Sequence, residues 1–188
     1  MGKVAVNSDR FLMTTPVVLL SACGNEKQPN IITLAWCGVI CSSPPMVYAS
    51  IRPSRHTYSL LEENGDFVIN VPSQDQLEVA DLCGVVSGKK EDKFDLCNFS
   101  AEISDVVNAP MIAECPVNIE CRTRQILELG VHHAFIAEVM GIKADENIMD
   151  ETGKTIDDFA PPVYSAGSRS YHRTELIEGA TYGFSKKK

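Results

Sequence analysis

Two clusters of basic residues stand out in an otherwise acidic sequence of 188 residues. The first runs from Ser50 to Thr57 and combines two arginines with several hydroxyl side chains; the second is Lys89-Lys90-Glu91-Asp92-Lys93. The first cluster lies where we expect a helix to begin, and the free N–H groups of a helix start bind phosphate well. A solvated loop with ordinary salt bridges is the alternative, and composition alone favours it. Phosphate binding is therefore one hypothesis for this segment.

Motifs for other kinds of chemistry fail on their spacing. No G-x-G-x-x-G or G-x-S-x-G occurs. The run from Gly84 to Lys90 resembles a phosphate loop, but it has three residues between its glycines instead of four, and a lysine where Ser or Thr belongs. His132 and His133 are adjacent, so in a strand they point to opposite faces and cannot hold one metal ion. We therefore expect no catalytic side chain and no metal site, and a chemically active protein would need a borrowed cofactor.

The seven cysteines do not form a recognisable redox or metal motif. Their number is odd, there is no C-x-x-C, and most lie in apolar stretches, where a free thiol behaves as a small hydrophobe. Cys37 and Cys41 are separated by three residues and no second pair with ligand spacing follows, which makes zinc binding the weaker interpretation. We expect buried, inert thiols in a reducing cytosol, and no part for them in redox chemistry.

Composition limits the class of protein. Hydrophobic residues make up 44% and charged residues 22%, which is typical of a globular protein and predicts a single domain over residues 1–188. The expected strands lie within a core from about 14 to 171, which leaves a tail from 174 to 188. No apolar run approaches the ~18–20 residues of a membrane span, and we expect a cytoplasmic protein without membrane contact. The net charge of −8 and the absence of a basic stripe argue against nucleic-acid binding.

Short β-branched runs separated by turn residues predict strands in the first half of the chain, at residues 16–23, 31–41, 46–51 and 66–71. The prolines at 44 and 45 indicate a loop over 42–45. Helices are expected over 54–64, with Ser54 as its cap and Gly65 as its stop, and over 76–86. In the second half we expect paired strands at 117–124 and 133–143, an acidic loop at 145–158 and a mixed loop at 164–173. This pattern predicts a mainly β fold, a small β-barrel with helical additions.

Several segments together resemble a known family. They are Asn30–Gly38, Ser42–Pro45, Ser50–Thr57, the run DFVINVP at 66–72, the run SGKKEDKF at 87–94 and Cys115-Pro116, in that order. The series resembles the flavin reductase-like family, whose fold is an FMN-binding split β-barrel, and within it the flavoredoxins most closely. The resemblance extends from about Thr14 to Tyr171.

The resemblance implies FMN as cofactor and NADH or NADPH as electron donor, in a homodimer with the flavin near the subunit interface. It places along the flavin and its ribityl chain the segment residues Asn30, Thr33, Leu34, Ala35 and Trp36. It places on the phosphate side Ser50, Arg52, Arg55 and Thr57. Lys93 is expected to reach the cofactor from the partner side of the cleft or from its own loop, and Tyr164 to lie near the ring. Ala137 stands where many relatives have glycine, and its methyl group is expected to narrow the cleft.

Two functions of different kinds stay open at this point. In the first, the chain is an FMN-binding oxidoreductase that passes electrons from a reduced nicotinamide or a protein donor to an acceptor. In the second, it is a flavin-binding electron carrier without nicotinamide-dependent turnover, and its acidic body docks a basic partner. A third interpretation is a barrel that binds no ligand and only oligomerises. Trp36, the single tryptophan, is expected beside the flavin, against the alternative of a core packing role.

Overall fold

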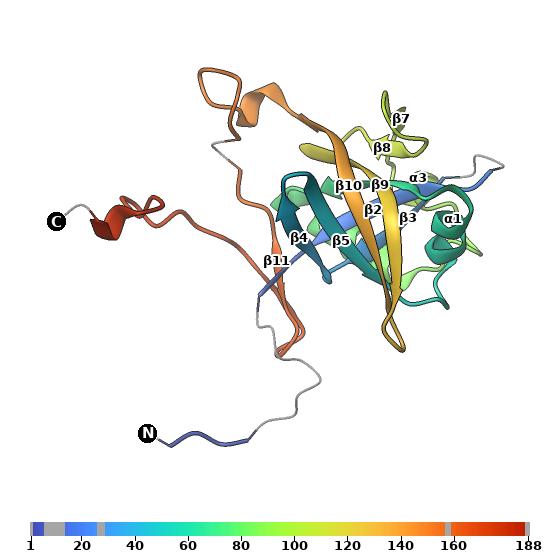
Figure 1. The fold of residues 1–188 in the computed structure, drawn as a ribbon, viewed down its shortest axis with the longest axis horizontal. Helices are drawn as coiled ribbons and strands as arrows, with labels where there is room; N and C mark the ends of the chain where they lie inside the picture. The colour runs from blue at the N-terminus through green and yellow to red at the C-terminus, as the bar shows by residue number, and fades with distance from the viewer. Residues whose placement is uncertain (1, 6–13, 26–28, 157–158, 187–188) are drawn as a thin grey trace.

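A curved antiparallel sheet of seven strands forms the body of the protein in the computed structural model, which describes residues 2–5, 14–25, 29–156 and 159–186 (Figure 1). Its strands, in sheet order, are β3 (Pro29–Leu34), β2 (Val18–Cys23), β6 (Asp66–Val71), β9 (Val117–Glu128), β10 (His133–Ala144), β5 (Pro45–Ile51) and β4 (Cys37–Ser42). Two smaller sheets join β1 (Thr15–Pro16) to β11 (Val163–Ser165) and β12 (Ser170–His172), and β7 (Ala101–Ile103) to β8 (Pro110–Ile112). The mainly β fold expected from the sequence is confirmed.

Three short α-helices flank the sheet. They are α1 (His56–Asn64), α2 (Leu77–Val85) and α3 (Lys93–Leu96), and single 3-10 turns lie at Gln74–Gln76, Glu146–Ile148 and Phe184–Lys186. The α1 helix joins β5 to β6 and packs on β2, whereas α2 and α3 pack on β3. As expected, α1 stops at Gly65, whose φ of 76° is a left-handed conformation that glycine adopts without a Cβ penalty. Among the described residues, no helix has the length and apolar character needed to cross a bilayer.

Apolar side chains pack on both faces of β2. Leu20 belongs to the cluster inside the curved sheet, which is built around the fully buried rings of Phe67 and Phe135. Its neighbour Leu19 belongs to a second cluster between the sheet and the helices α2 and α3, together with Ile31. Burial on both faces explains why this strand is a continuous apolar run and shows no alternation.

The buried amide of Asn70 ties β6 to three other strands. Its Nδ2 donates to the Leu19 carbonyl oxygen and to Ser21 Oγ, both at 2.9 Å. Its Oδ1 accepts from the Ile112 backbone N–H at 2.9 Å and from Asn118 Nδ2 at 2.8 Å. All of its polar atoms are thus satisfied, and a one-residue slip of any of these strands would break several of the bonds together.

Two expectations for the first half of the chain are wrong in detail. The single strand expected at 31–41 is broken after Leu34, because β3 pairs with β2 whereas β4 pairs with β5 on the far edge of the sheet. The loop expected at 42–45 is shorter, since Pro45 already belongs to β5. This break leaves Ala35 and Trp36 between two strands at the end of the sheet.

Two further expectations are also corrected. Ser54 does not cap α1: the cap position is Arg55, and its side chain makes no capping hydrogen bond to the helix. The mixed loop expected at 164–173 is a hairpin, in which β11 pairs with β12 and β1 pairs with β11. The glycine- and serine-rich composition of this segment reflects its turn, not the absence of strands.

Candidate functional site

Two adjoining hollows lie where β3 ends and α1 begins, and they share Ile32 and Arg55. We call them the aromatic hollow and the basic hollow. The aromatic hollow, of about 190 Å³, is lined by Ile32, Thr33, Leu34, Ala35, Trp36, Ser50, Ile51, Arg52, Arg55 and His132. The basic hollow, of about 60 Å³, is lined by Asn30, Ile32, Ser54, Arg55, His56, Thr57, Cys83, Gly84, Val86, Ser87, Gly88 and Lys93. Ten of the eleven residues selected from the sequence line one or both hollows.

Lys93 is buried at the basic hollow and is held by the protein itself. Its Nζ donates to the carbonyl oxygens of Ile31, at 2.8 Å, and of Cys83, at 2.6 Å. Burial lowers the pKa of this ammonium group, and the charge of Arg55 lowers it further, while the thiols of Cys83 and Cys97 act in the opposite direction. A protonated lysine has three N–H donors, so two bonds to carbonyls leave one donor for a ligand.

The N-terminus of α1 forms another wall of the basic hollow. The Nδ1 atom of His56, the first helical residue, is buried without a hydrogen-bond partner among the described residues. Burial lowers the pKa of His56, followed by the charges of Lys89 and Lys93, whereas Glu63 raises it. Because no side chain caps this helix, its first N–H groups and the His56 ring can bind an anion.

Two contacts hold the strand, helix and loop around the basic hollow in place. Asn30 Nδ2 donates to Thr57 Oγ1 at 2.7 Å, which ties β3 to the start of α1. The loop after α2 approaches so closely that a Cβ added at Gly88 would lie 1.9 Å from Asn30 Oδ1. Only glycine fits there. The two basic clusters of the sequence thereby come together at one site.

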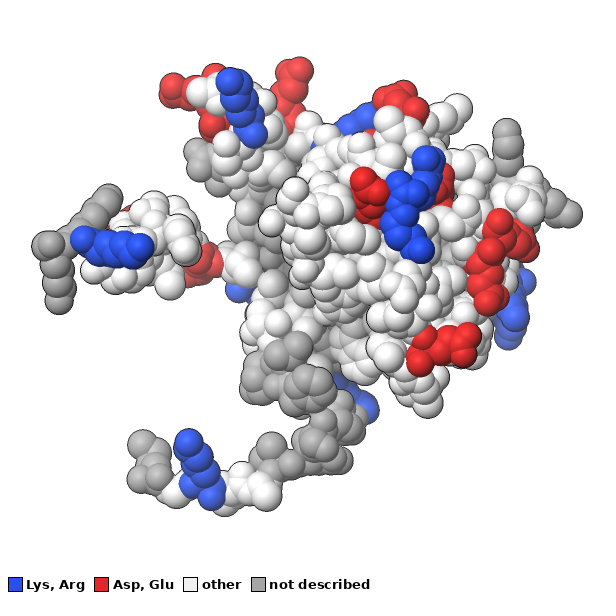
Figure 2. Space-filling view, viewed as in Figure 1, with Lys and Arg blue, Asp and Glu red and all other residues white. Residues whose placement is uncertain are grey.

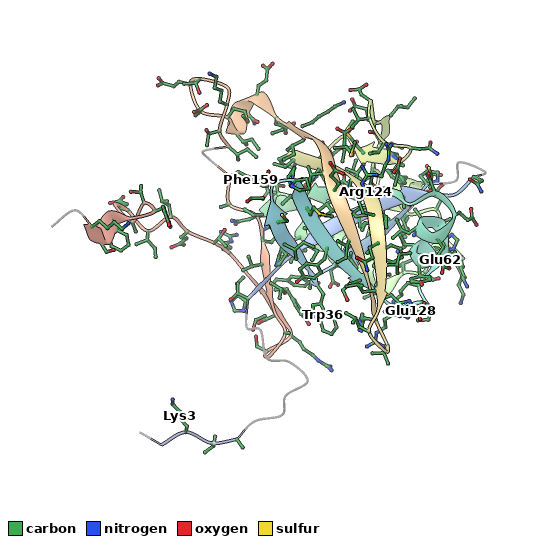
Figure 3. The ribbon with its side chains drawn as sticks, viewed as in Figure 1. Lys3, Trp36, Glu62, Arg124, Glu128 and Phe159 are labelled. Atoms are coloured by element: carbon green, nitrogen blue, oxygen red, sulfur yellow. The ribbon has the colours of Figure 1, made fainter. Side chains whose placement is uncertain are left out.

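The aromatic hollow combines two rings with an arginine. The rings of Trp36 and His132 lie 4.5 Å apart between centroids at 44°, which places Trp36 beside the β9–β10 turn at the end of the sheet (Figure 3). Arg52 Nε donates to His132 Nε2 at 3.3 Å, which assigns the histidine proton to Nδ1. Burial lowers the pKa of His132, and Arg52 and Arg55 lower it further, so the ring is neutral at pH 7. With 43% of its surface exposed, Trp36 offers a flat apolar face for stacking.

Three residues named in the sequence analysis have well-defined positions in the single chain. Tyr164 lies in β11, with its ring 5.3 Å from that of Tyr171, and it lines neither hollow. Ala137 is fully buried in the core between β9 and β5, so its methyl group does not narrow the groove. Lys93 reaches the basic hollow from its own chain. Ala137 is therefore a packing residue in this structure.

His56 and His132 are the lining residues that sequence reasoning did not select. His56 lies inside the basic run from 50 to 57, and only its position in the first turn of a helix distinguishes it from a solvated histidine. His132 precedes β10 and contacts Trp36, whereas His133 begins the strand and its Nδ1 lies 2.8 Å from the hydroxyl of Tyr58. The two histidines therefore do not lie on opposite faces of one strand, as the sequence predicted, but make separate contacts on either side of the start of β10.

The cysteine side chains lie mostly in the core. Six of the seven are buried and Cys41 is partly exposed. Burial raises the pKa of Cys37 and of Cys121 to about 12, and it raises that of Cys83, whose sulfur lies 3.3 Å from that of Cys97, to about 12 as well. Thiols of this kind are poor nucleophiles. Within the described part of the chain, no group of three or more potential ligands is arranged to hold a metal ion.

The same fold occurs in solved flavoproteins. The flavoredoxin of Desulfovibrio vulgaris (Miyazaki F) is 30% identical, with a TM-score of 0.89 over 97% of this chain and 98% of that one. The flavoredoxin of Methanosarcina acetivorans is also 30% identical, with a TM-score of 0.88 over 97% of both chains. An FMN-binding protein of Thermus thermophilus shares the fold at 19% identity, with a TM-score of 0.78 over 94% of this chain and 97% of that one. The architecture is thus that of the flavin-binding split barrels.

The family assignment follows from the sequence match. Residues 10–172 match the family model described as the flavin reductase like domain. The chain belongs to this family. Its resemblance to the flavoredoxins, expected from the sequence, is confirmed by the two solved structures.

Proposed function

We propose that the protein binds FMN along the two hollows, with the phosphate in the basic hollow and the ring system against Ala35 and Trp36. The observation that carries the proposal is the set of unused donors at the basic hollow: the remaining N–H of Lys93, the His56 ring and the uncapped start of α1. Donors around a small cavity fit a phosphate group. The aromatic hollow next to it fits the flat, mostly apolar ring system.

Each residue then has a definite binding role. Arg55, Lys93 and the start of α1 bind the phosphate, and Thr57 and Asn30 position that end of the groove. Thr33 is fixed by donating its hydroxyl proton to the Ala80 carbonyl oxygen, so its backbone can present hydrogen bonds to the ribityl chain and ring edge. Ser50, Leu34 and Arg52 then lie along the ring system. Trp36 and His132 exclude water from its open side.

We infer an oxidoreductase role in which bound FMN supplies the chemistry of hydride and single-electron transfer. The electrons come from a reduced nicotinamide, NADH or NADPH, or from a protein donor, and pass to an acceptor. The protein needs no acid–base pair for this, and none of the residues along the groove has to act as a nucleophile. A second candidate is an electron carrier without nicotinamide turnover, favoured by the net charge of −8, which suits docking to a basic protein partner.

We further propose a homodimer, with the groove near the interface. The two hollows are small and open, so much of a flavin bound there would be left in water by one chain alone. Trp36 is directly followed by the edge strand β4, where Val39 and Ile40 expose their side chains. An exposed apolar edge strand is a frequent site of association between chains.

The test is reconstitution of the apoprotein with FMN, followed by anaerobic addition of NADH or NADPH and measurement of the visible flavin absorbance. Bleaching that exceeds that of free FMN supports the reductase. If dithionite or a reduced protein donor bleaches the bound flavin and neither nicotinamide does, the result supports the electron carrier. If the folded apoprotein takes up no FMN, the proposal is wrong.

A matched pair of lysine variants makes the binding test specific. Lys93→Met should prevent FMN uptake, because it removes the buried ammonium group at the basic hollow. Lys90→Met changes an exposed lysine of the same cluster and should leave uptake unchanged. Circular dichroism establishes that both variants are folded. Equal FMN uptake by Lys93→Met and Lys90→Met would show that the phosphate does not bind in this hollow.

A further inference from the structure

The C-terminal segment leaves the body of the protein as an arm, residues 174–186, that extends to one side (Figure 1). Its large apolar side chains have almost no contact with the rest of the chain: Leu176 is 89% exposed and Tyr182 108%, and Ile177 and Phe184 are exposed as well. Four such side chains in 13 residues are unusual for a solvated tail, because disordered tails are poor in aromatic and branched residues. The arm therefore has the composition of a segment that binds an apolar surface.

A matching surface lies at the far end of β10. Residues 145–156 project from the body there, and between this projection and the strand is a hollow of about 890 Å³. Ile142, Met149 and Ile156 provide its apolar lining, while Glu146, Asp150 and Glu151 provide negative charge. Figure 2 shows the acidic side chains on this projection, at the upper left of the molecule. We call it the acidic hollow.

We propose that the arm of one chain docks in the acidic hollow of a second copy, and that this exchange is reciprocal. The inference rests on the homodimer of the proposed function and adds the contact that holds it together. Because each chain carries both an arm and a hollow, two copies related by a two-fold axis satisfy both contacts, and the assembly closes at a dimer.

Charge supports the pairing. Glu175 and Glu178 lie near the start of the arm, so only its far end is basic: Tyr182 and Phe184 are followed by Lys186, and the sequence continues with two more lysines. The projection from 145 to 156 holds four acidic residues against a single basic one, Lys154. An apolar segment with a basic end thus meets an apolar floor with an acidic rim, which selects this hollow over a neutral apolar surface.

The surface area also agrees with a stable dimer. A buried Tyr or Phe removes about 150–250 Å² from water, so the fully exposed Tyr182 rings and the half-exposed Phe184 rings of two arms contribute roughly 450–750 Å² on the arm side. The hollows lose a comparable area, which brings the total to about 900–1,500 Å² and so into the range of a specific interface. In the single chain the arm does not fill its own hollow, although both are part of the same molecule.

The test is the dimer dissociation constant measured by sedimentation velocity on the full chain and its variants. In the arm variant, Tyr182→Ser with Phe184→Ser, the constant should rise by at least about 100-fold, because each dimer loses four buried rings. The hollow variant, Ile142→Glu, should also weaken the dimer. The control is Val85→Glu in α2, which introduces the same charge at a residue of similar exposure. Val85 is 73% exposed and Ile142 is 60% exposed. An unchanged constant in the arm variant overturns the proposal.

A mixing experiment distinguishes exchange between chains from an arm that folds onto its own body. The arm variant keeps an intact hollow and the hollow variant keeps an intact arm, so a heterodimer of the two restores one contact that both homodimers lack. The equimolar mixture should therefore dimerise more tightly than either variant alone. A mixture no tighter than its components overturns the exchange.

The proposed function is tested separately. FMN titration of the same variants reports on the groove, which contains none of the substituted residues. A full chain that is monomeric but binds FMN would overturn the arm contact and the homodimer while leaving the flavin site intact. A dimer that binds no FMN would overturn the flavin site alone.

Discussion

Replacing Arg55 by alanine should weaken the binding of FMN and leave the binding of riboflavin almost unchanged. Arg55 lies where the two hollows meet, at the N-cap position of α1, and its charge lowers the pKa of the buried Lys93. A charge-assisted hydrogen bond to phosphate contributes about 1.5–3 kcal/mol. Because the Arg55 side chain is exposed, solvent screening favours the lower end of this range. The FMN dissociation constant should therefore rise about 10-fold.

The assay is a fluorescence titration of apoprotein with FMN and, separately, with riboflavin, which has the same ring and ribityl chain but no phosphate. The quantity of interest is the ratio of the two dissociation constants. Arg52→Ala is the matched control, because Arg52 is an exposed arginine of the same loop that lines only the aromatic hollow. It should weaken both ligands to a similar degree and leave the ratio unchanged.

Two results would refute the reasoning. Equal losses of FMN and riboflavin affinity in Arg55→Ala would mean that this arginine does not contact the phosphate. A loss confined to FMN in Arg52→Ala, with Arg55→Ala unaffected, would place the phosphate at the Trp36 end and reverse the orientation of the ligand. Raising the ionic strength should shrink the effect of Arg55→Ala, since an exposed charge is screened over about 8–10 Å.

Three further predictions concern other parts of the groove and the core. Trp36 emission should be quenched saturably at one FMN per chain. Trp36→Phe should weaken FMN by about 2–12-fold, through loss of the hydrogen bond that we expect the indole N–H to donate to the flavin; emission indifferent to FMN would place the ring system elsewhere. Cys37→Ser with Cys41→Ser should leave flavin reduction by dithionite intact, and abolished reduction in a folded, loaded double variant would implicate a thiol. Folding lowers the pKa of His132. As the pH falls below about 6.5, the unfolded chain therefore protonates this histidine before the folded chain does, and the free energy of unfolding decreases. The thermal midpoint of the apoprotein should therefore fall between about pH 7 and 5.5, and His132→Gln should reduce this fall; the same fall in the variant would contradict the assignment.

Local patterns predicted most of the strands, because burial on one or both faces leaves a mark in the sequence. The strands β2, β5, β6, β9 and β10 and the helix α1 fall close to the expected positions. The break at Ala35–Trp36 was not predictable, because nothing in this apolar segment interrupts a strand locally. It arises from pairing, since β3 and β4 hydrogen-bond at opposite edges of the sheet. The four-residue α3 was missed because it is too short to show helical periodicity.

The groove was predictable as a set of residues but not as a geometry. The family resemblance selected Arg55 and Lys93, and the structure places both at the basic hollow. It did not indicate that Lys93 is anchored by two carbonyl groups, since backbone partners from Ile31 and Cys83 leave no pattern in a sequence. His132 was not selected, because its contact with Trp36 joins the β9–β10 turn to the segment between β3 and β4, and such a contact leaves no local pattern in the sequence.

The anchoring of Lys93 has a consequence for how a ligand enters the groove. Fixing a lysine side chain costs about 1.5–2 kcal/mol of rotamer entropy. Here the carbonyl oxygens of Ile31 and Cys83 already hold the ammonium group, so folding has met this cost before any ligand arrives. An anion reaching the basic hollow therefore orders little of the protein at that end, and its binding energy is retained as affinity. Uptake at the phosphate end should need no slow rearrangement, and a chain that has lost its ligand keeps that end of the groove ready to bind again.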